Sequence, residues 1–224
     1  LENEQGGGFV INGAGASDYS GYSVSSAGDV NGDGLDDVII GAYQADPNSS
    51  SSGSSYVVFG TTFTSAIELS NLENEQGGGF VINGAGASDY SGYSVSAAGD
   101  VNGDGLDDVI IGADAADGDS NATSGSGSSY VVFGTTSTNA IELSTLEDEG
   151  GGGFVIHGAE ASDNSGYSVS AAGDVNGDGL DDLVIGAHTA DGDSNGVTSS
   201  GSAYIVFGKD DRSTIELLNL EEGS

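Results

Sequence analysis

The stretch from Gly21 to Ala42, G-Y-S-V-S-S-A-G-D-V-N-G-D-G-L-D-D-V-I-I-G-A, decides the fold because the chain contains it three times. Nearly the same string fills residues 92–113 and 166–187, so that Asp29 recurs as Asp100 and Asp174 at spacings of 71 and 74 residues. A fixed period of this length is typical of repeat architectures. We divide the chain into a single segment of three repeats, residues 1–71, 72–145 and 146–219, and residues 220–224 begin the next period.

Each repeat favours short β-strands. In the first repeat, apolar packets lie at residues 9–12, 22–27, 37–41 and 56–60, with a shorter apolar stretch at 66–69. Clusters of Gly, Ser, Asp and Asn separate them, as turns would. Four such strands make one small antiparallel sheet, which cannot bury both of its faces alone. We therefore expect an all-β fold in which the sheets stack as a β-propeller or as a linear array.

The composition excludes several function classes. The 224 residues include 36 Asp and Glu but 2 Lys and Arg, which gives a formal net charge of −34. A surface this anionic repels phosphate backbones and anionic lipids, so we expect no nucleic-acid partner and no membrane insertion. The chain has no Cys and no apolar run long enough to span a bilayer. Abundant Asp, Gly, Ser and Thr with almost no Lys favours an extracellular or cell-surface location.

The string Asp29-Val30-Asn31-Gly32-Asp33-Gly34-Leu35-Asp36-Asp37 indicates a cation-binding loop. Side-chain oxygens stand at its positions 1, 3, 5 and 9, and Gly34 at position 6 permits the turn that brings the Leu35 carbonyl to position 7. These oxygen ligands suit Ca²⁺, with water completing its shell.

Metals other than Ca²⁺ suit the residues of the loop less well. The absence of His and Cys argues against zinc or copper, and Mg²⁺ demands stricter octahedral geometry. The loop is not an EF-hand, because Ile40 stands at position 12 where that motif has a bidentate Glu. An Asx-rich turn that reverses the chain without metal remains the alternative.

The strands and the aspartate string together resemble the FG-GAP repeat of integrin α-subunit β-propellers, above all its bacterial versions, over essentially the whole chain. In that family each repeat builds one four-stranded antiparallel blade, and Ca²⁺ binds in the loop between the first two strands of a blade. The resemblance implies three Ca²⁺ per chain, with these ligands: Asp29, Asn31, Asp33, Leu35 and Asp37; Asp100, Asn102, Asp104, Leu106 and Asp108; and Asp174, Asn176, Asp178, Leu180 and Asp182.

This chain departs from the family pattern in two ways. Position 3 of each loop is Asn where integrin loops often have Asp, so each site has three carboxylates and we expect an affinity suited to millimolar extracellular calcium. Integrin propellers have seven blades, whereas this chain supplies three repeats.

Several further residues have both a structural and a functional interpretation. The segments 117–121 and 191–195 carry alternating oxygens that suit either a solvated loop or a second cation. We expect Asp18, Asp89 and Asp163 to cap turns. For His157 and His188 we expect structural positions rather than a catalytic role. Tyr19 and Tyr90 stand beside Asp in loops, where their rings would be able to stack on a sugar.

We conclude that the chain is a binding module and not an enzyme: a calcium-binding, integrin-α-like propeller segment in extracellular adhesion or in surface or protein recognition. Two alternatives stay open, a sugar-binding propeller lectin and a non-catalytic domain of a larger secreted enzyme. The ligand itself is not specified by these residues.

The repeat phase also predicts an assembly. By resemblance, residues 9–12 form the outermost strand of a preceding blade, and the third repeat lacks such a strand. Three blades are too few to close a propeller, which needs roughly four to eight. We therefore expect a six-bladed homodimer in which each N-terminal strand completes the partner's last blade, beside residues 204–207.

Overall fold

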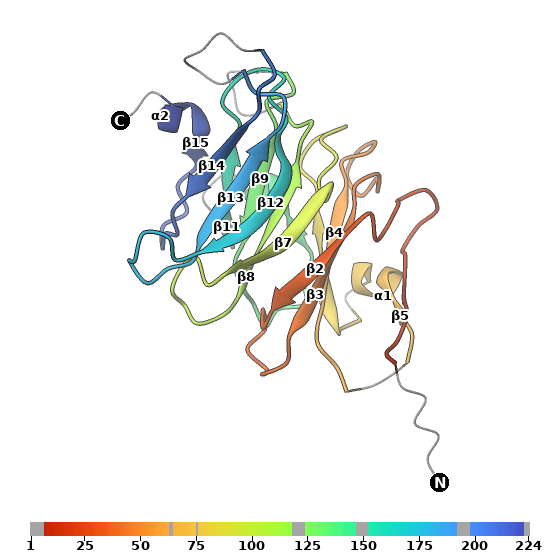
Figure 1. The fold of residues 1–224 in the computed structure, drawn as a ribbon. Coiled ribbons are helices and arrows are strands. Elements are labelled where there is room, and N and C mark those ends of the chain that lie inside the picture. Colours follow the sequence, from red (N-terminus) through yellow and green to blue (C-terminus); the bar gives the residue numbers. More distant parts are fainter. Residues whose placement is uncertain are drawn as a thin grey trace.

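The computed structural model of this chain describes residues 7–62, 65–74, 76–117, 124–146, 152–191 and 198–221. Short strands make up nearly all of the regular structure in these ranges, and the helical segments have five residues or fewer (Figure 1). The prediction of an all-β fold is confirmed.

Each repeat contributes three inner strands to one antiparallel sheet, in chain order. They are β2 (Ser23–Gly28), β3 (Asp37–Ala42) and β4 (Ser54–Val58); β7 (Ser94–Gly99), β8 (Asp108–Ala113) and β9 (Ser128–Val132); and β12 (Ser165–Gly173), β13 (Asp182–Ala187) and β14 (Ser202–Val206). We call these sets the first, second and third sheets. In the first repeat, the predicted strand boundaries differ from these by at most two residues.

The outer strand of a sheet comes from the following repeat. β6 (Gly79–Asn83) pairs antiparallel with β4, and β11 (Gly153–His157) pairs in the same way with β9. Their counterpart in the first repeat, β1 (Ile11–Asn12), pairs with β5 (Ile67–Glu68) instead. This arrangement agrees with the expectation that residues 9–12 belong to a preceding sheet.

A short parallel strand flanks each outer strand. β5, β10 (Ile141–Glu142) and β15 (Ile215–Glu216) pair in parallel with β1, β6 and β11. Helical turns follow directly at α1 (Leu69–Glu73), η1 (Leu143–Thr145) and α2 (Leu217–Glu221). The sequence indicated the apolar stretch but not its pairing, because two residues carry no alternation from which a sheet face can be inferred.

Two of the sheets contain the predicted four antiparallel strands, with a fifth, parallel strand at the outer edge, whereas the prediction of four antiparallel strands is wrong for the third sheet. Within the described ranges, β12, β13 and β14 form a sheet of three strands. The cause is the donation of each outer strand by the next repeat: three repeats complete two sheets and leave β1 at the opposite end. The stacked sheets form a β-propeller-like arrangement (Figure 1).

Two apolar cores hold the three sheets face to face. One core joins Ile39 and Val57 of the first sheet to residues of the second, and the other joins the second sheet to Leu183 and Ile185 of the third. The strand β8 lies between them, and its apolar run from Val109 to Ile111 is fully buried. Its continuous apolar sequence is what burial of both strand faces requires.

Leu146 is fully buried in the core between the first and second sheets. We therefore predict that truncation of its side chain strongly destabilises the folded chain. Leu146→Ala should lower the free energy of unfolding by about 2–5 kcal/mol, through lost transfer energy and the cavity left behind. Urea unfolding measures this, with Leu218→Ala at an exposed position of α2 as the control. Equal effects of the two substitutions would contradict the packing described.

Candidate functional site

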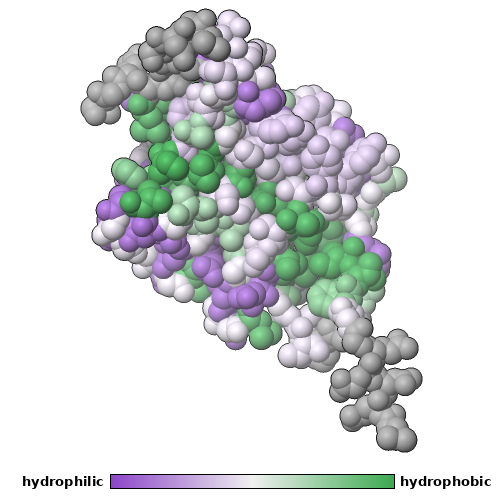
Figure 2. All heavy atoms as spheres, viewed as in Figure 1, coloured by the Kyte–Doolittle hydropathy of each residue, from purple (hydrophilic) through white to green (hydrophobic). Residues whose placement is uncertain are grey.

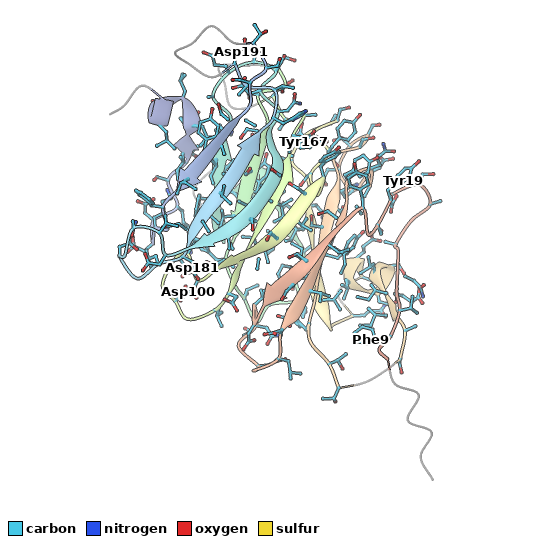
Figure 3. All side chains as sticks on the ribbon, in the orientation of Figure 1. Phe9, Tyr19, Asp100, Tyr167, Asp181 and Asp191 are labelled. Carbon is cyan, nitrogen blue, oxygen red and sulfur yellow. The ribbon has the colours of Figure 1, made fainter. Side chains whose placement is uncertain are left out.

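The three predicted cation loops lie at equivalent places in the fold. Residues 29–36 join β2 to β3, residues 100–107 join β7 to β8, and residues 174–181 join β12 to β13. Each position-9 aspartate is the first residue of the second strand. All fifteen predicted ligand residues fall within the described ranges. Figure 3 shows Asp100 and Asp181, from the second and third loops, side by side at one end of the sheets.

Inside each loop the side-chain oxygens accept hydrogen bonds from the loop's own backbone amides. The Asp33 amide donates to Asp29 Oδ1 at 3.0 Å and to Asn31 Oδ1 at 2.9 Å. The Gly34 amide donates to Asp29 Oδ2, and the Leu35 amide to Asp33 Oδ1, both at 2.9 Å. Gly34 has φ 88°, which a residue with a side chain rarely adopts. The same four hydrogen bonds recur in the second and third loops.

The aspartate at position 9 anchors the base of each loop. Asp37 is fully buried, and its two oxygens accept the Val30 amide at 3.0 Å and the Gly60 amide at 2.7 Å. Asp108 and Asp182 make the equivalent bonds. Burial, with a smaller contribution from the nearby carboxylates of the same loop, raises the pKa of Asp108 to about 7. The surroundings of this carboxyl within the protein therefore disfavour its ionised form.

The donor set of each loop fits a hard cation by its chemistry: three carboxylates, an amide oxygen and a carbonyl, with no nitrogen or sulfur. Within the described part of the chain, however, no three His, Cys, Asp or Glu side chains are grouped as a metal site would need. The loop oxygens here have the hydrogen-bonded geometry of Asx turns, the alternative that the sequence left open.

The structure gives a role to the position-8 aspartates, which the sequence prediction did not include. Asp107 Oδ2 accepts the Asp29 amide of the preceding loop at 2.7 Å, and the Asp107 amide donates to the Asp29 carbonyl at 3.2 Å. Asp181 makes the same two contacts with Asp100, at 3.1 and 3.2 Å. We call this reciprocal pair the loop clamp. The Asp-Asp doublet recurs in all three repeats, and this was the sequence feature that could have drawn attention to the position-8 aspartates.

The weaker sequence candidates mostly have structural positions. Asp89 and Asp163 accept the amides of Gly86 and Glu160, and Asp18 is bonded to the backbone of Gly15, so turn capping is confirmed for all three. His157 lies on β11 opposite Ser128, whose hydroxyl is 3.2 Å from Nδ1. The ring of His188 lies 3.9 Å from that of Tyr167, between centroids.

The second-cation hypothesis concerns residues that lie mostly outside the described ranges, namely 118–121 and 192–195. The two described members, Asp117 and Asp191, accept the amides of Gly125 and Ser199. These bonds close the loops, and the hypothesis itself is untested.

A cluster of tyrosines lies at the end of the sheets opposite the cation loops. The ring of Tyr43 is 5.8 Å from Tyr19 and 5.9 Å from Tyr90, between centroids. Tyr22 and Tyr93, which directly precede β2 and β7, continue the cluster at 5.1 Å from each other, between centroids. Sequence reasoning missed Tyr43, because Asp and His stand at its position in the second and third repeats. Figure 3 shows Tyr19 and Tyr167 on this side.

The described geometry agrees with one known family. The FG-GAP repeat family matches residues 20–58, 91–132 and 165–206, which together are more than half of the chain. The chain belongs to the FG-GAP repeat family. Each FG-GAP match begins at the first inner strand of a sheet or just before it, includes one aspartate loop and ends on the third inner strand.

Two curated relatives of this FG-GAP protein are integrin α subunits of Drosophila melanogaster. Integrin alpha-PS2 is 28% identical over 190 residues, which cover 82% of this chain and 12% of the relative. Integrin alpha-PS5 is 31% identical over 184 residues, which cover 81% of this chain and 16% of the relative. The chain thus spans a small part of the length of these relatives. Among the described residues, no helix is long and apolar enough to cross a membrane.

The loop clamp predicts a stability difference between two substitutions of Asp107. Asp107→Ala leaves the Asp29 amide without its acceptor and should lower the free energy of unfolding by roughly 1–3 kcal/mol. Asp107→Asn keeps an acceptor oxygen and should cost clearly less. Urea unfolding in saturating calcium compares the two variants. If both match the unsubstituted chain, the clamp contributes nothing to stability.

Proposed function

We propose that this FG-GAP chain is a calcium-binding recognition module of the integrin-α type, in which each of the three sheets is one propeller blade and each aspartate loop binds one Ca²⁺. The module acts in adhesion or in protein recognition outside the cell, and we assign it no catalytic step. Membership of the FG-GAP family and the similarity to integrin α subunits support this proposal.

The observation that carries the calcium proposal is the accumulation of carboxylates in all three loops. Each loop has aspartates at positions 1, 5 and 9. Those at positions 1 and 5 add to the effect of burial in raising the pKa of the position-9 aspartate in the first two loops, although the three side chains are not drawn together in this structure as they would be around a metal. The chain has 2 basic residues for 36 acidic ones, so its own side chains cannot neutralise three such loops. A bound divalent cation would hold these carboxylates ionised and offset their repulsion.

The ligands in each loop would be the four oxygen side chains and the position-7 carbonyl. In the second loop these are Asp100, Asn102, Asp104, Asp108 and the carbonyl of Leu106. Calcium would supply structural charge neutralisation there. The chain's own residues set the loop shape, through the position-1 and position-9 hydrogen bonds that are already formed.

Calcium should therefore raise the melting temperature strongly, because a ligand that binds only the folded state stabilises it by mass action. We expect EDTA to reverse the effect, and Mg²⁺ to replace Ca²⁺ poorly. Isothermal titration calorimetry should give three Ca²⁺ per chain and two for Asp104→Ala. Asp210→Ala removes an exposed acidic residue outside the loops and should keep three. A melting temperature indifferent to calcium and EDTA would refute the calcium proposal.

The tyrosine cluster supports a second candidate function, carbohydrate binding. Tyr19 and Tyr90 both have φ 57°, an uncommon left-handed conformation that is found more often at functional sites. Tyr19 is 57% exposed, and exposed rings with hydroxyl groups suit the apolar face and polar rim of a sugar. The ring of Tyr43 packs against both of these rings.

A glycan array tests this second candidate. The unsubstituted chain should retain at least one class of glycan, and Tyr43→Ala should weaken that binding at least tenfold. Tyr19→Phe keeps the ring and serves as the conservative control. If the array retains nothing, or Tyr43→Ala binds unchanged, carbohydrate recognition at this cluster is excluded and protein recognition stands as the function.

A further inference from the structure

Each aspartate loop contains the dipeptide Asn-Gly, with the asparagine at loop position 3. The three pairs are Asn31-Gly32, Asn102-Gly103 and Asn176-Gly177. A glycine after an asparagine leaves the next backbone nitrogen open to approach, because glycine has no Cβ. That nitrogen can attack the side chain of the asparagine, which then loses its amide nitrogen as ammonia. The calcium proposal uses the asparagine oxygen only as a ligand, so this reactivity is a separate property of the same residue.

The first two loops surround this dipeptide in nearly the same way. Asn31 and Asn102 are both half-buried, and the glycines that follow them are exposed, with φ 75° and 76°. Each asparagine Oδ1 accepts the amide of the position-5 aspartate, at 2.9 Å in the first loop and 2.8 Å in the second. Figure 2 shows hydrophilic residues gathered at the end of the sheets that carries these loops. The first and second loops therefore form a matched pair for comparison.

The loops differ at the amide of the glycine. The Gly103 amide donates to Asp100 Oδ1 at 2.7 Å, and the Gly177 amide of the third loop donates to Asp174 Oδ1 at 2.6 Å. Within the described part of the chain, no oxygen accepts a hydrogen bond from the Gly32 amide. A hydrogen bond to a carboxylate is charge-assisted and strong, and it opposes loss of the amide proton. The Gly32 nitrogen is thus the least restrained of the three nucleophiles.

Attack of the Gly32 nitrogen on Cγ of Asn31 would form a five-membered succinimide ring. The new bond joins this nitrogen to Cγ, the amide proton passes to water, and the side-chain nitrogen takes up a proton and leaves as ammonia. Negative charge develops on Asn31 Oδ1 during the attack, and the Asp33 amide already donates to that oxygen, as a donor in an oxyanion hole does. Water then opens the ring at one carbonyl to give aspartate or at the other to give isoaspartate.

We propose that Asn31 is a site of spontaneous deamidation, which the unbonded Gly32 amide favours over Asn102 and Asn176. The reaction requires water alone besides the chain, and both products add one carboxylate to the first loop. The consequence for calcium rests on the proposed function. Aspartate at position 3 would give this loop four carboxylates, and the affinity of a Ca²⁺ site depends on the charge of its ligands. Isoaspartate would lengthen the loop backbone by one carbon and weaken the site.

Exposure alone predicts a different order of reaction. Asn176 and Gly177 are both exposed, whereas Asn31 is half-buried. If access to water controlled the rate, Asn176 would react first. Asn83-Gly84, outside the loops, provides an unreactive reference within the same chain. Gly84 is buried and its amide donates to the Gly53 carbonyl at 2.9 Å, so both burial and hydrogen bonding restrain it.

The experiment is peptide mass spectrometry during incubation in heavy-oxygen water, which marks every succinimide that hydrolyses, under conditions in which circular dichroism shows a folded chain. Peptides of the first loop are recognised because Ser26 stands where the other repeats have alanine. Asn31 should deamidate about tenfold faster than Asn102 and Asn176, whose glycine amides must first break a hydrogen bond to a charged group. Asn83 should keep its amide. In urea the three loop asparagines should react at equal rates, because the folded geometry is lost.

Equal rates for the three loop asparagines in the folded chain, or fastest reaction at Asn176, would overturn the proposal. Calorimetry on Asn31→Asp tests the consequence for calcium: one site should bind Ca²⁺ about tenfold more tightly. Asn71→Asp adds the same charge at an exposed position of α1 and should leave all sites unchanged. An unchanged affinity of Asn31→Asp contradicts this consequence alone. A chain that binds no calcium contradicts the calcium proposal, and the deamidation rates still decide the proposal on Asn31.

Discussion

The donation of an outer strand from one repeat to the sheet of the preceding repeat is the constraint on which the rest of this structure depends. The pairing of β6 with β4 and of β11 with β9 ties consecutive repeats together through main-chain hydrogen bonds. It also brings the apolar faces of successive sheets into contact, and so creates the two cores between them. A repeat of this kind cannot satisfy its own backbone or bury its own faces, so stability is a property of junctions rather than of single repeats.

The aspartate loops are part of the same junctions. Each loop leaves the first inner strand of one sheet, and in the second and third loops the position-8 aspartate binds the backbone of the loop before it. The position-9 aspartate ties the loop base to a residue beyond the third strand, as Asp37 does with Gly60. A cation bound in one loop would therefore order the contact between two sheets as well as the loop itself. This coupling gives a physical reason for one loop in every repeat.

Much of the fold and part of the candidate site were predictable from the sequence, because the threefold repeat fixes both period and strand order. The inner strands and the fifteen loop residues stand where the repeat placed them. The parallel pairing of β5 with β1 was not predictable, since two residues have no periodicity. The clamp by Asp107 and the place of Tyr43 between Tyr19 and Tyr90 depend on contacts between repeats, which a comparison of equivalent positions within the sequence cannot show.

The positions of the carboxylates in this structure show how the strongly acidic composition affects folding. A net charge of −34 on 224 residues would oppose compaction if the carboxylates were spread evenly over the surface. Twelve of the acidic residues are instead held in three loops, and three of these twelve are fully buried: Asp37, Asp108 and Asp182. Burying a carboxylate next to others is unfavourable unless something positive compensates it. The same loops line the junctions that the sheets share, so the repulsion is greatest where the fold most needs close contact, and a divalent cation bound there would act directly on folding.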